Sequence, residues 1–170
     1  EAVADNNALI DLAKARAWKL EDLSEATVKL ESTTFKKEIG YYTAVFCVND
    51  DEDVKVAISI KVDEGDVIEH GDEYTIVASN IVMTVDEAKA IKSNHELIGL
   101  AKARAYKRKD MTSGTVMREA TTFKAEEGDY TATFYVDQEQ TTKATVKIKV
   151  VKGDVITHGD KYTIVGSNIV

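Results

Sequence analysis

The fold is indicated most directly by the stretch YTATFYV at residues 130–136, in which apolar and polar side chains alternate. Successive side chains of a β-strand point to opposite faces of the sheet, so this pattern predicts a strand with one buried face. A second alternating stretch, KATVKIKV at residues 143–150, follows the polar residues 137–141. Together the two stretches predict an antiparallel hairpin with one face in the core and one in water.

The whole pattern occurs twice, at a fixed offset of 88 residues. Residues 1–82 align without a gap onto residues 89–170, and 45 of the 82 aligned positions are identical. We call these segments repeat 1 and repeat 2, and we expect two tandem domains joined by residues 83–88. The boundary is open between residues 73 and 85, because the stretch Ile81 to Val85 could close the first module or supply the first strand of the second.

Each repeat begins with a helical pattern. Residues 93–96, Ser-Asn-His-Glu, have the form of a capping box, and a helix of about three turns is expected because four apolar residues then share one face: Leu97, Leu100, Ala101 and Ala105. Repeat 1 has Asp5 as a capping type but Ala8 where the box needs Glu, so its helix should begin less firmly. Residues 84–87 also have capping-box form and predict a short helical turn from Glu87.

Short strands and turns fill the rest of each repeat. Two Gly-Asp turns lie six residues apart, bracket a short Val-Ile strand and precede another strand: Gly65-Asp66 with Gly71-Asp72, and Gly153-Asp154 with Gly159-Asp160. Half-buried strands, frequent turns and no alternation of strands with long helices predict a mainly β fold. We therefore expect two antiparallel β-sandwich modules, each with one short α-helix.

Composition and charge exclude several classes of function. The chain is 44% apolar and 31% charged, which is typical of a folded protein. The longest apolar run is far shorter than the ~20 residues that cross a bilayer, and we expect no membrane insertion and an internal fragment of a longer protein. Repeat 1 carries 8 basic and 18 acidic residues, whereas repeat 2 carries 14 basic and 10 acidic residues. An acidic first repeat would repel a phosphate backbone, so no nucleic-acid partner is expected.

Each repeat contains a further set of motifs, namely a Thr-Thr-Phe segment, a Gly-x-Tyr-Thr strand, an acidic turn and a final alternating strand: residues 33–35, 40–43, 48–50 and up to 62, matched by 121–123, 128–131 and 136–137. In these motifs the sequence resembles the immunoglobulin-like repeats of bacterial surface proteins. The resemblance implies immunoglobulin-like sandwiches in tandem within an extracellular protein of Gram-positive bacteria, attached to the cell wall through regions outside this sequence. The helix at residues 9–18 and 97–106 is additional to the plain repeat.

Two functions follow from that resemblance. The first is a spacer or stalk, in which the repeats add length and hold an adhesive or other domain away from the cell. The alternative is an adhesion module that binds a host protein or a glycan directly, because the charges of the repeats differ while their apolar pattern agrees. Under either hypothesis we expect a monomer whose partners include the neighbouring repeats of the same chain.

Four groups of residues are candidates for chemistry. Asp50, Asp51 and Asp53 offer oxygens to calcium, but repeat 2 lacks most of this charge, and a solvated hairpin tip is the alternative. The other three groups recur in both repeats. His70 and His158 lie near Ser79 and Ser167 in sequence and could belong to a hydrolytic triad. An isopeptide crosslink could join Asn80 or Asn168 to one of the matched lysines, which are Lys14 and Lys102, Lys36 and Lys124, Lys55 and Lys143, and Lys61 and Lys149. A glycan shelf could be formed by the matched aromatic residues, which are Trp18 and Tyr106, Tyr42 and Tyr130, and Tyr74 and Tyr162. Each is also explained by turns, exposed lysines or core packing. No combination of nucleophile, base and metal ligands recurs in both repeats, so we expect neither enzyme activity nor a cofactor.

Overall fold

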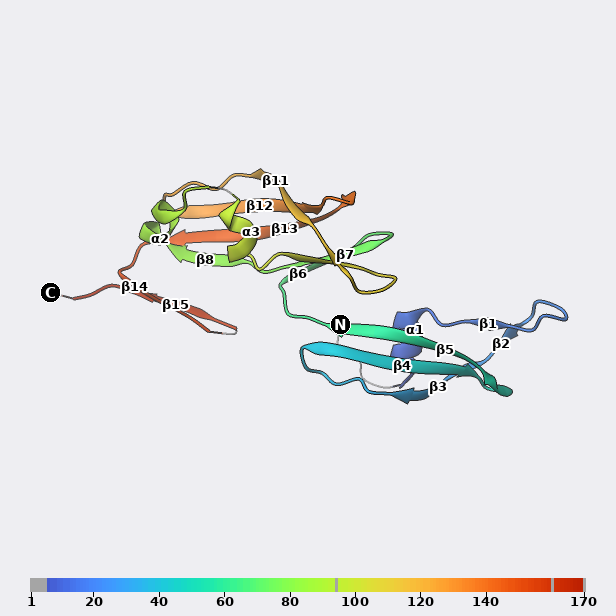
Figure 1. Ribbon diagram of the computed structural model, residues 1–170. Coiled ribbons are helices and arrows are strands. Elements are labelled where there is room, and N and C mark those ends of the chain that lie inside the picture. The colour runs from blue at the N-terminus through green and yellow to red at the C-terminus, as the bar shows by residue number, and fades with distance from the viewer. Residues whose placement is uncertain (1–5, 94, 160, 170) are drawn as a thin grey trace. The chain divides into compact units, whose positions relative to one another are not determined.

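The structure is a computed structural model that describes residues 6–93, 95–159 and 161–169 of the chain (Figure 1). Strands account for 53% and helices for 12% of the residues, which confirms the mainly β fold predicted from the alternating pattern. The chain divides into two compact units, residues 1–63 and residues 64–170, which we call unit 1 and unit 2.

The described part of unit 1 contains one helix and five strands: α1 (Asn6–Ala13), β1 (Ala17–Trp18), β2 (Glu25–Ala26), β3 (Val28–Thr33), β4 (Gly40–Val48) and β5 (Asp51–Val62). Strands β3, β4 and β5 form an antiparallel sheet in that order, while β1 pairs with β2. The predicted hairpin is confirmed, because β4 and β5 are joined at Asn49 and Asp50. Helix α1 packs on β3 and buries Leu9 with Ala44 and Phe46.

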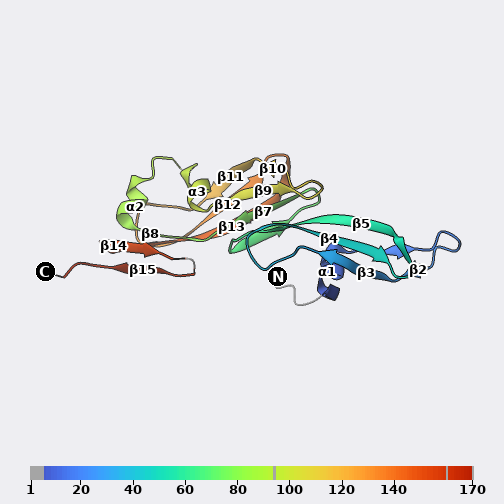
Figure 2. The same cartoon turned by 60° about the horizontal axis from the view of Figure 1, so that its bottom comes forward.

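Among its described residues, unit 2 contains ten strands and two helices, where one helix was expected: β6 (Val67–His70), β7 (Tyr74–Ala78), β8 (Ile81–Thr84), α2 (Val85–Ala90), α3 (Glu96–Leu100), β9 (Arg104–Lys107), β10 (Ser113–Gly114), β11 (Val116–Thr121), β12 (Gly128–Val136), β13 (Glu139–Val151), β14 (Val155–His158) and β15 (Thr163–Gly166). Two four-stranded sheets run in the orders β10-β9-β7-β6 and β11-β12-β13-β8. Strand β8 runs parallel to β13, whereas the other pairs in these sheets are antiparallel. Strands β14 and β15 form a separate two-stranded sheet (Figure 2).

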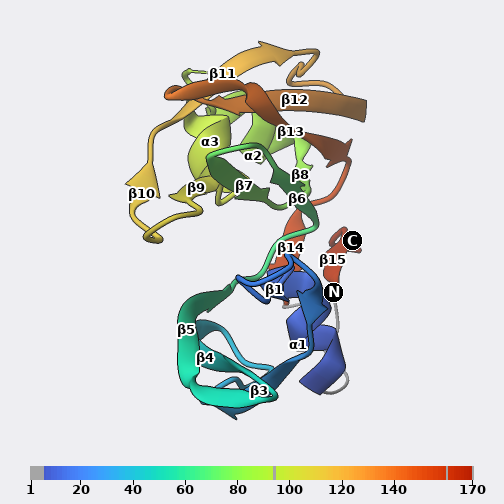
Figure 3. The same cartoon turned by 90° about the vertical axis from the view of Figure 1, so that its right-hand side faces the viewer.

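The core of unit 2 lies between its two four-stranded sheets (Figure 3). The alternating residues of β12 and β13 are fully buried, as predicted: Ala132, Phe134, Val136, Ala144, Val146, Ile148 and Val150. The intervening Lys143, Lys147 and Lys149 are exposed, so the polar face of β13 was also predicted correctly. Helix α3 contributes Leu97 to the same core, and helix α2 contributes Ala88.

The helices differ from their predictions in length. Helix α2 begins with the predicted capping box, in which the Thr84 hydroxyl accepts from the Glu87 amide and the Glu87 carboxylate accepts from the Thr84 amide. Helix α3 has five residues instead of three turns. It ends early because Lys102 has a left-handed φ of 47° and the Ala103 amide donates to the carbonyl of Ile98, a pairing that closes a helix C-terminus.

The units of the fold are offset from the sequence repeats. The expected division was residues 1–82, 83–88 and 89–170, but the structure divides between Asp63 and Glu64. The physical reason is strand pairing, because β6, β7 and β8 come from the end of repeat 1 and lie in the sheets of repeat 2. Of the two possibilities left open for residues 81–85, the structure has the second, in which this stretch supplies a strand to the following module.

Candidate functional site

The candidate site is the place where the end of repeat 1 pairs with strands of repeat 2 in unit 2. We call residues 64–84 the donor segment, and strands β9 and β13 the acceptor surface. Strand β7 of the donor segment pairs antiparallel with β9, so that Ile76 lies opposite Ala105. Strand β8 pairs parallel with β13, so that Ile81 lies opposite Ile148. One donor segment therefore extends both sheets of the sandwich.

Apolar side chains hold the donor segment in place. Its buried residues are 0% to 9% exposed: Tyr74, Ile76, Val77, Ala78, Ile81 and Met83. All except Val77 belong to the same core cluster as Phe134 and Val146 of repeat 2. Burying a large aliphatic side chain contributes about 1.5–3 kcal/mol, so these residues offset a substantial part of the entropy cost of ordering the segment.

A carboxylate on the acceptor surface binds the turn before β7. Glu139 accepts hydrogen bonds from the backbone amides of Asp72 (2.8 Å), Glu73 (3.1 Å) and Tyr74 (2.9 Å). It also accepts one from the hydroxyl of Thr142 at 2.7 Å. These bonds favour the ionised form and lower the pKa of the Glu139 carboxyl; the Thr142 bond is the largest cause, and partial desolvation opposes it.

Gly71 lets this turn approach the acceptor surface closely. A Cβ atom placed on Gly71 would lie 1.7 Å from the Thr142 Oγ1 atom and 2.4 Å from the Glu139 Oε2 atom. A side chain therefore has no room at this position. The Gly-Asp pair that the sequence marked only as a turn is thus a contact between repeats.

The charges of the donor segment and the acceptor surface are complementary. Residues 64–84 contain five acidic residues and no Lys or Arg. Lys102 lies 3.5 Å from the Glu64 carboxylate, and Lys107 lies 4.0 Å from that of Glu73. Two arginines also donate to donor-segment carbonyls: Arg104 to Glu64 at 2.9 Å and Arg108 to Gly71 at 2.8 Å. The acidic end of repeat 1 therefore faces basic residues of repeat 2.

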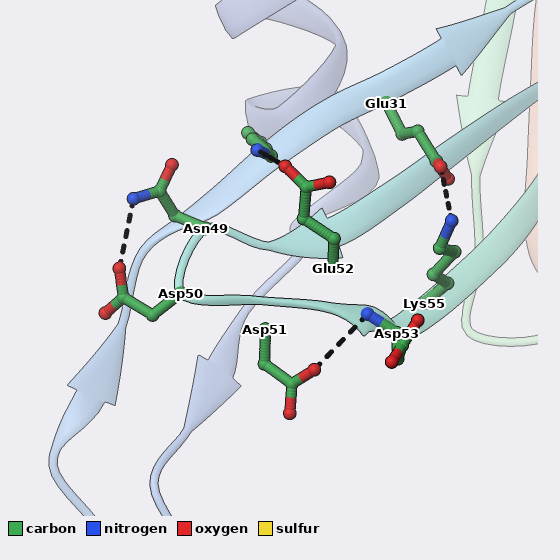
Figure 4. Close-up of polar contacts among 8 residues, drawn as sticks. Glu31, Asn49, Asp50, Asp51, Glu52, Asp53 and Lys55 are labelled. Atoms are coloured by element: carbon green, nitrogen blue, oxygen red, sulfur yellow. Dashed lines mark hydrogen bonds and ion pairs between the residues drawn. The ribbon is translucent and has the colours of Figure 1, made fainter.

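The candidate calcium residues do not converge on one point. Figure 4 shows the carboxylates of Asp50, Asp51 and Asp53 pointing in different directions at the tip between β4 and β5. Asp50 accepts from the Asn49 side-chain amide at 3.1 Å, and Asp51 accepts from the Asp53 backbone amide at 3.3 Å. The neighbouring Glu52 forms an ion pair with Lys29, which lowers the Glu52 pKa and raises the Lys29 pKa. Among the described residues, no group of three or more His, Cys, Asp or Glu side chains is arranged to hold a metal ion.

The histidine and lysine candidates have other contacts. The His70 and His158 rings hydrogen-bond to the hydroxyls of Thr75 and Thr163 on the adjacent strands, rather than to Ser79 or Ser167. Lys55 and Lys143 form ion pairs with Glu31 and Glu119 on the exposed face of their sheets. The Asn80 side chain is exposed and accepts from the Lys147 backbone amide at 2.8 Å, so it is not buried beside any of these lysines.

The aromatic candidates lie in three different environments. Tyr42 and Tyr130 are half-buried, and their hydroxyls donate to the carbonyls of Glu38 and Glu126. Tyr74 is 9% exposed in the core, whereas its counterpart Tyr162 is 84% exposed. Trp18 is 52% exposed, whereas Tyr106 is half-buried. Two of the three pairs thus differ in exposure between their copies, so the pattern of aromatic residues is not the same exposed shelf in both repeats.

Comparison with models of known protein families finds no match to this chain, and no curated protein is found to be similar to it. Among the described residues, no helix combines the length and the apolar character that a membrane crossing needs.

Sequence reasoning missed Glu139, Thr142 and Gly71 as contacts between repeats. One signal was available. The donor segment recurs as residues 152–170, where 15 of the 19 positions equivalent to residues 64–82 are identical. This agreement is much higher than that of the repeats as a whole, and it includes turn and polar positions that a free surface does not constrain.

Proposed function

We propose that the chain is part of a spacer in a bacterial cell-surface protein, built from immunoglobulin-like β-sandwich modules that follow one another in tandem. The observation that carries this proposal is the donor segment, which ends the first sequence repeat but is folded into the sheets of unit 2. Because this segment is folded, only residues 63–66 connect β5 with β6, and no long flexible linker separates the two units in sequence. The extracellular, wall-attached location rests on the resemblance to bacterial immunoglobulin-like repeats.

Strand geometry supports a role in carrying load. Strand β13 has 13 residues, and at about 3.3 Å per residue it spans about 4 nm, so each module adds useful length. Strands β8 and β13 are parallel. A force that draws the beginning of β8 away from the end of β13 therefore loads their hydrogen bonds together instead of opening them one by one.

Single-molecule force spectroscopy on the whole chain tests this proposal. We expect one dominant unfolding step that releases residues 64–151, with a contour-length gain of about 30 nm at roughly 3.6 Å per residue. Two steps of similar force, corresponding to residues 1–82 and 89–170, would contradict the packing of residues 64–84 in unit 2. Release of residues 64–84 well before the rest of the sandwich would exclude a load-bearing role.

The alternative function is adhesion, in which a module binds a host protein or a glycan. The observation that favours it is the exposure of Trp18 at 52% and Tyr41 at 62%, together with the charge difference between repeats. Binding of the chain to a matrix-protein and glycan array, lost on Trp18→Ala or Tyr41→Ala, would support adhesion. Absence of binding on both arrays would leave the spacer as the proposed function.

A further inference from the structure

Unit 1 has strands that correspond to the acceptor surface of unit 2, and in the part of unit 1 that the structure describes no donor segment pairs with them. At the repeat offset of 88 residues, β1 corresponds to β9 and β5 corresponds to β13. Among the described residues, β1 pairs only with β2, and β5 pairs only with β4. Both strands therefore present an open edge where their counterparts bind β7 and β8. An open edge with unpaired backbone groups is a template for another strand.

The side chains of this surface are exposed where their counterparts are buried. Val54 and Val56 are 56% and 53% exposed, whereas Thr142 and Ala144 are 4% and 0% exposed. Ile58, Ile60 and Val62 are only half-buried, although Val146, Ile148 and Val150 are fully buried. The apolar face of β5 thus lacks the covering that β6, β7 and β8 give to β13.

A cavity marks the place where β7 would lie. An open cavity of about 260 Å³ in unit 1 is lined by residues of α1, β1 and β2 and the chain around them: Ile10, Ala15, Arg16, Ala17, Glu25, Ala26 and Val28. In unit 2 the counterpart of Ala17 is Ala105, which lies opposite Ile76. The counterpart of Ala26 is Gly114, whose Cβ position lies 2.9 Å from the Tyr74 ring. The cavity therefore corresponds to the space that Tyr74 and Ile76 fill on unit 2.

The C-terminal segment, residues 152–170, carries the matching apolar residues without a core around them. Tyr162, Ile164 and Ile169 are 84%, 72% and 99% exposed. Their counterparts in the donor segment, Tyr74, Ile76 and Ile81, are 9%, 0% and 6% exposed. The hairpin of β14 and β15 has the same register as that of β6 and β7, so it is already folded in the donor form.

Gly159 supports the same donor role for the C-terminal segment. A Cβ on its counterpart Gly71 would lie 1.7 Å from the Thr142 side chain of the acceptor surface. A Cβ on Gly159 would meet only the Tyr162 carbonyl, at 3.3 Å. The C-terminal segment thus keeps the glycine that a bound donor segment requires.

We propose that the C-terminal segment of one copy of this chain binds the open acceptor surface of unit 1 of a second copy. Strand β15 would pair with β1, and Ile169 would lie along β5, as β7 and Ile81 of β8 do on β9 and β13 of unit 2. The contact is heterologous, because donor and acceptor are different surfaces, and such a contact forms open head-to-tail chains. This goes beyond the spacer function, because the joint lies between chains. The monomer expected from the sequence is then the state at low concentration.

Two sequence differences from the corresponding contact in unit 2, one on each side, affect the strength of the proposed contact. Lys152 and Lys161 replace Glu64 and Glu73, and they would face Lys14 and Lys19, the counterparts of Lys102 and Lys107. The corresponding pairs on unit 2 are exposed to solvent, with separations of 3.5 Å and 4.0 Å, so the like charges weaken the contact only modestly. Ala26 replaces Gly114, so the Tyr162 ring must shift away from the added methyl group.

Sedimentation velocity on the whole chain, from micromolar to millimolar concentration, tests the proposal. We expect the average sedimentation coefficient to rise without a plateau at the dimer. Ile164→Asp, on the donor side, and Val56→Asp, on the acceptor side, should each abolish the rise. Both residues are more than half exposed, so folding should tolerate either change. A mixture of the two variants retains one intact donor and one intact acceptor and should form a dimer that grows no further.

Ile39→Glu is the matched control, because Ile39 is also an apolar residue of unit 1 and is 60% exposed. Its counterpart on unit 2 is the exposed residue Glu127, which lies outside the acceptor surface. It should leave assembly unchanged; an equal loss would indicate general apolar association and overturn the proposal. Lys152→Glu with Lys161→Glu should strengthen assembly by about twofold to tenfold. A monomer at every concentration would overturn the proposal. A second result would also overturn the proposal. If the Ile164→Asp chain bound a peptide of residues 64–84 but not a peptide of residues 152–170, the occupant of the acceptor surface would be a different segment.

Discussion

The Glu139 carboxylate accepts a hydrogen bond from the backbone amide of Tyr74 at 2.9 Å, although the two residues belong to different sequence repeats. The same carboxylate accepts from the amides of Asp72 and Glu73. Three consecutive amides at the end of repeat 1 are thus satisfied by one side chain of repeat 2. This contact fixes where β7 begins. Through β7 it also fixes the position of the donor segment, which contributes strands to both sheets.

The first prediction concerns the pH dependence of unit 2. The pKa of Glu139 is lowered in the folded state, so its ionised form contributes stability that is fully present above the ordinary carboxyl pKa of the unfolded chain. That contribution is lost as the pH falls through the lowered folded-state value. We expect Glu139→Gln to lower the melting temperature near neutral pH and to reduce its fall between about pH 6 and about pH 3. Calorimetry across this range measures both effects.

Asp129→Asn is a suitable control for Glu139→Gln. Asp129 lies on β12 and forms an exposed ion pair with Lys149, and its side chain is 80% exposed. An exposed pair of this kind contributes at most about 1 kcal/mol, so its removal should change the melting curve little. Equal pH profiles for the wild-type chain and the Glu139→Gln variant would show that Glu139 does not bind the donor segment in solution.

The second prediction compares two glycines at equivalent positions. Gly71→Ala places a methyl group against Thr142 and Glu139, so the turn must move away from the acceptor surface. Overpacking of this kind costs about 1–3 kcal/mol, and we expect a matching loss in the free energy of unfolding of unit 2. Gly159→Ala meets only the Tyr162 carbonyl at 3.3 Å and should cost clearly less. Chemical denaturation of both variants measures the difference, and equal losses would contradict the close approach at Gly71.

The third prediction compares two isoleucines. Ile76 is fully buried opposite Ala105, whereas its counterpart Ile164 is 72% exposed. Ile76→Ala should cost about 2–5 kcal/mol, because it removes buried methyl groups and leaves a cavity. Ile164→Ala should change stability by less than about 0.5 kcal/mol in dilute solution. The comparison is made by urea denaturation at a concentration where the chain is monomeric. A similar cost at both positions would show that the C-terminal segment is packed against a core.

Local sequence patterns predicted the elements that are stabilised by contacts within one element or between consecutive elements. The alternation at residues 130–136 and 143–150 predicted the hairpin of β12 and β13 with its buried face, because both strands share one short connection. The capping residues Thr84 and Glu87 predicted α2, since both partners of each hydrogen bond lie within one turn. In each case the decisive contacts lie within one element or join two elements that follow each other directly in the chain.

The position of the module boundary within the 88-residue repeat could not be predicted in the same way. A repeat with an 88-residue period has the same sequence statistics wherever its boundary is drawn, so the alignment alone does not place the boundary. The pairs that decide it join distant residues, such as Ile76 with Ala105 and Ile81 with Ile148. Alternation shows which face of β8 is buried, but it does not show which strand lies beside it. For the same reason the role of Glu139, on an otherwise polar hairpin tip, was not foreseen.

The final prediction tests the position of the module boundary with two fragments of nearly equal length. Residues 64–151 contain the donor segment, both helices and the acceptor surface, and they should fold alone with one cooperative transition. A domain of 88 residues should show an unfolding enthalpy of about 60 kcal/mol at its midpoint. Residues 89–170 form a complete sequence repeat but lack β6, β7 and β8, so the face of β13 that these strands cover would be exposed.

The fragment of residues 89–170 does contain a donor-like segment, but this segment cannot simply replace the missing one. It ends at Val170, the counterpart of Val82, and therefore lacks Met83, which is 4% exposed in the core, and Ala88 of α2, which is 1% exposed. Its Lys152 and Lys161 would also face Lys102 and Lys107, where the donor segment has Glu64 and Glu73. We therefore expect calorimetry of this fragment to show a broad, weak transition well below that of residues 64–151. A sharp transition of equal midpoint and enthalpy in both fragments would mean that the sandwich does not depend on strands from the preceding repeat.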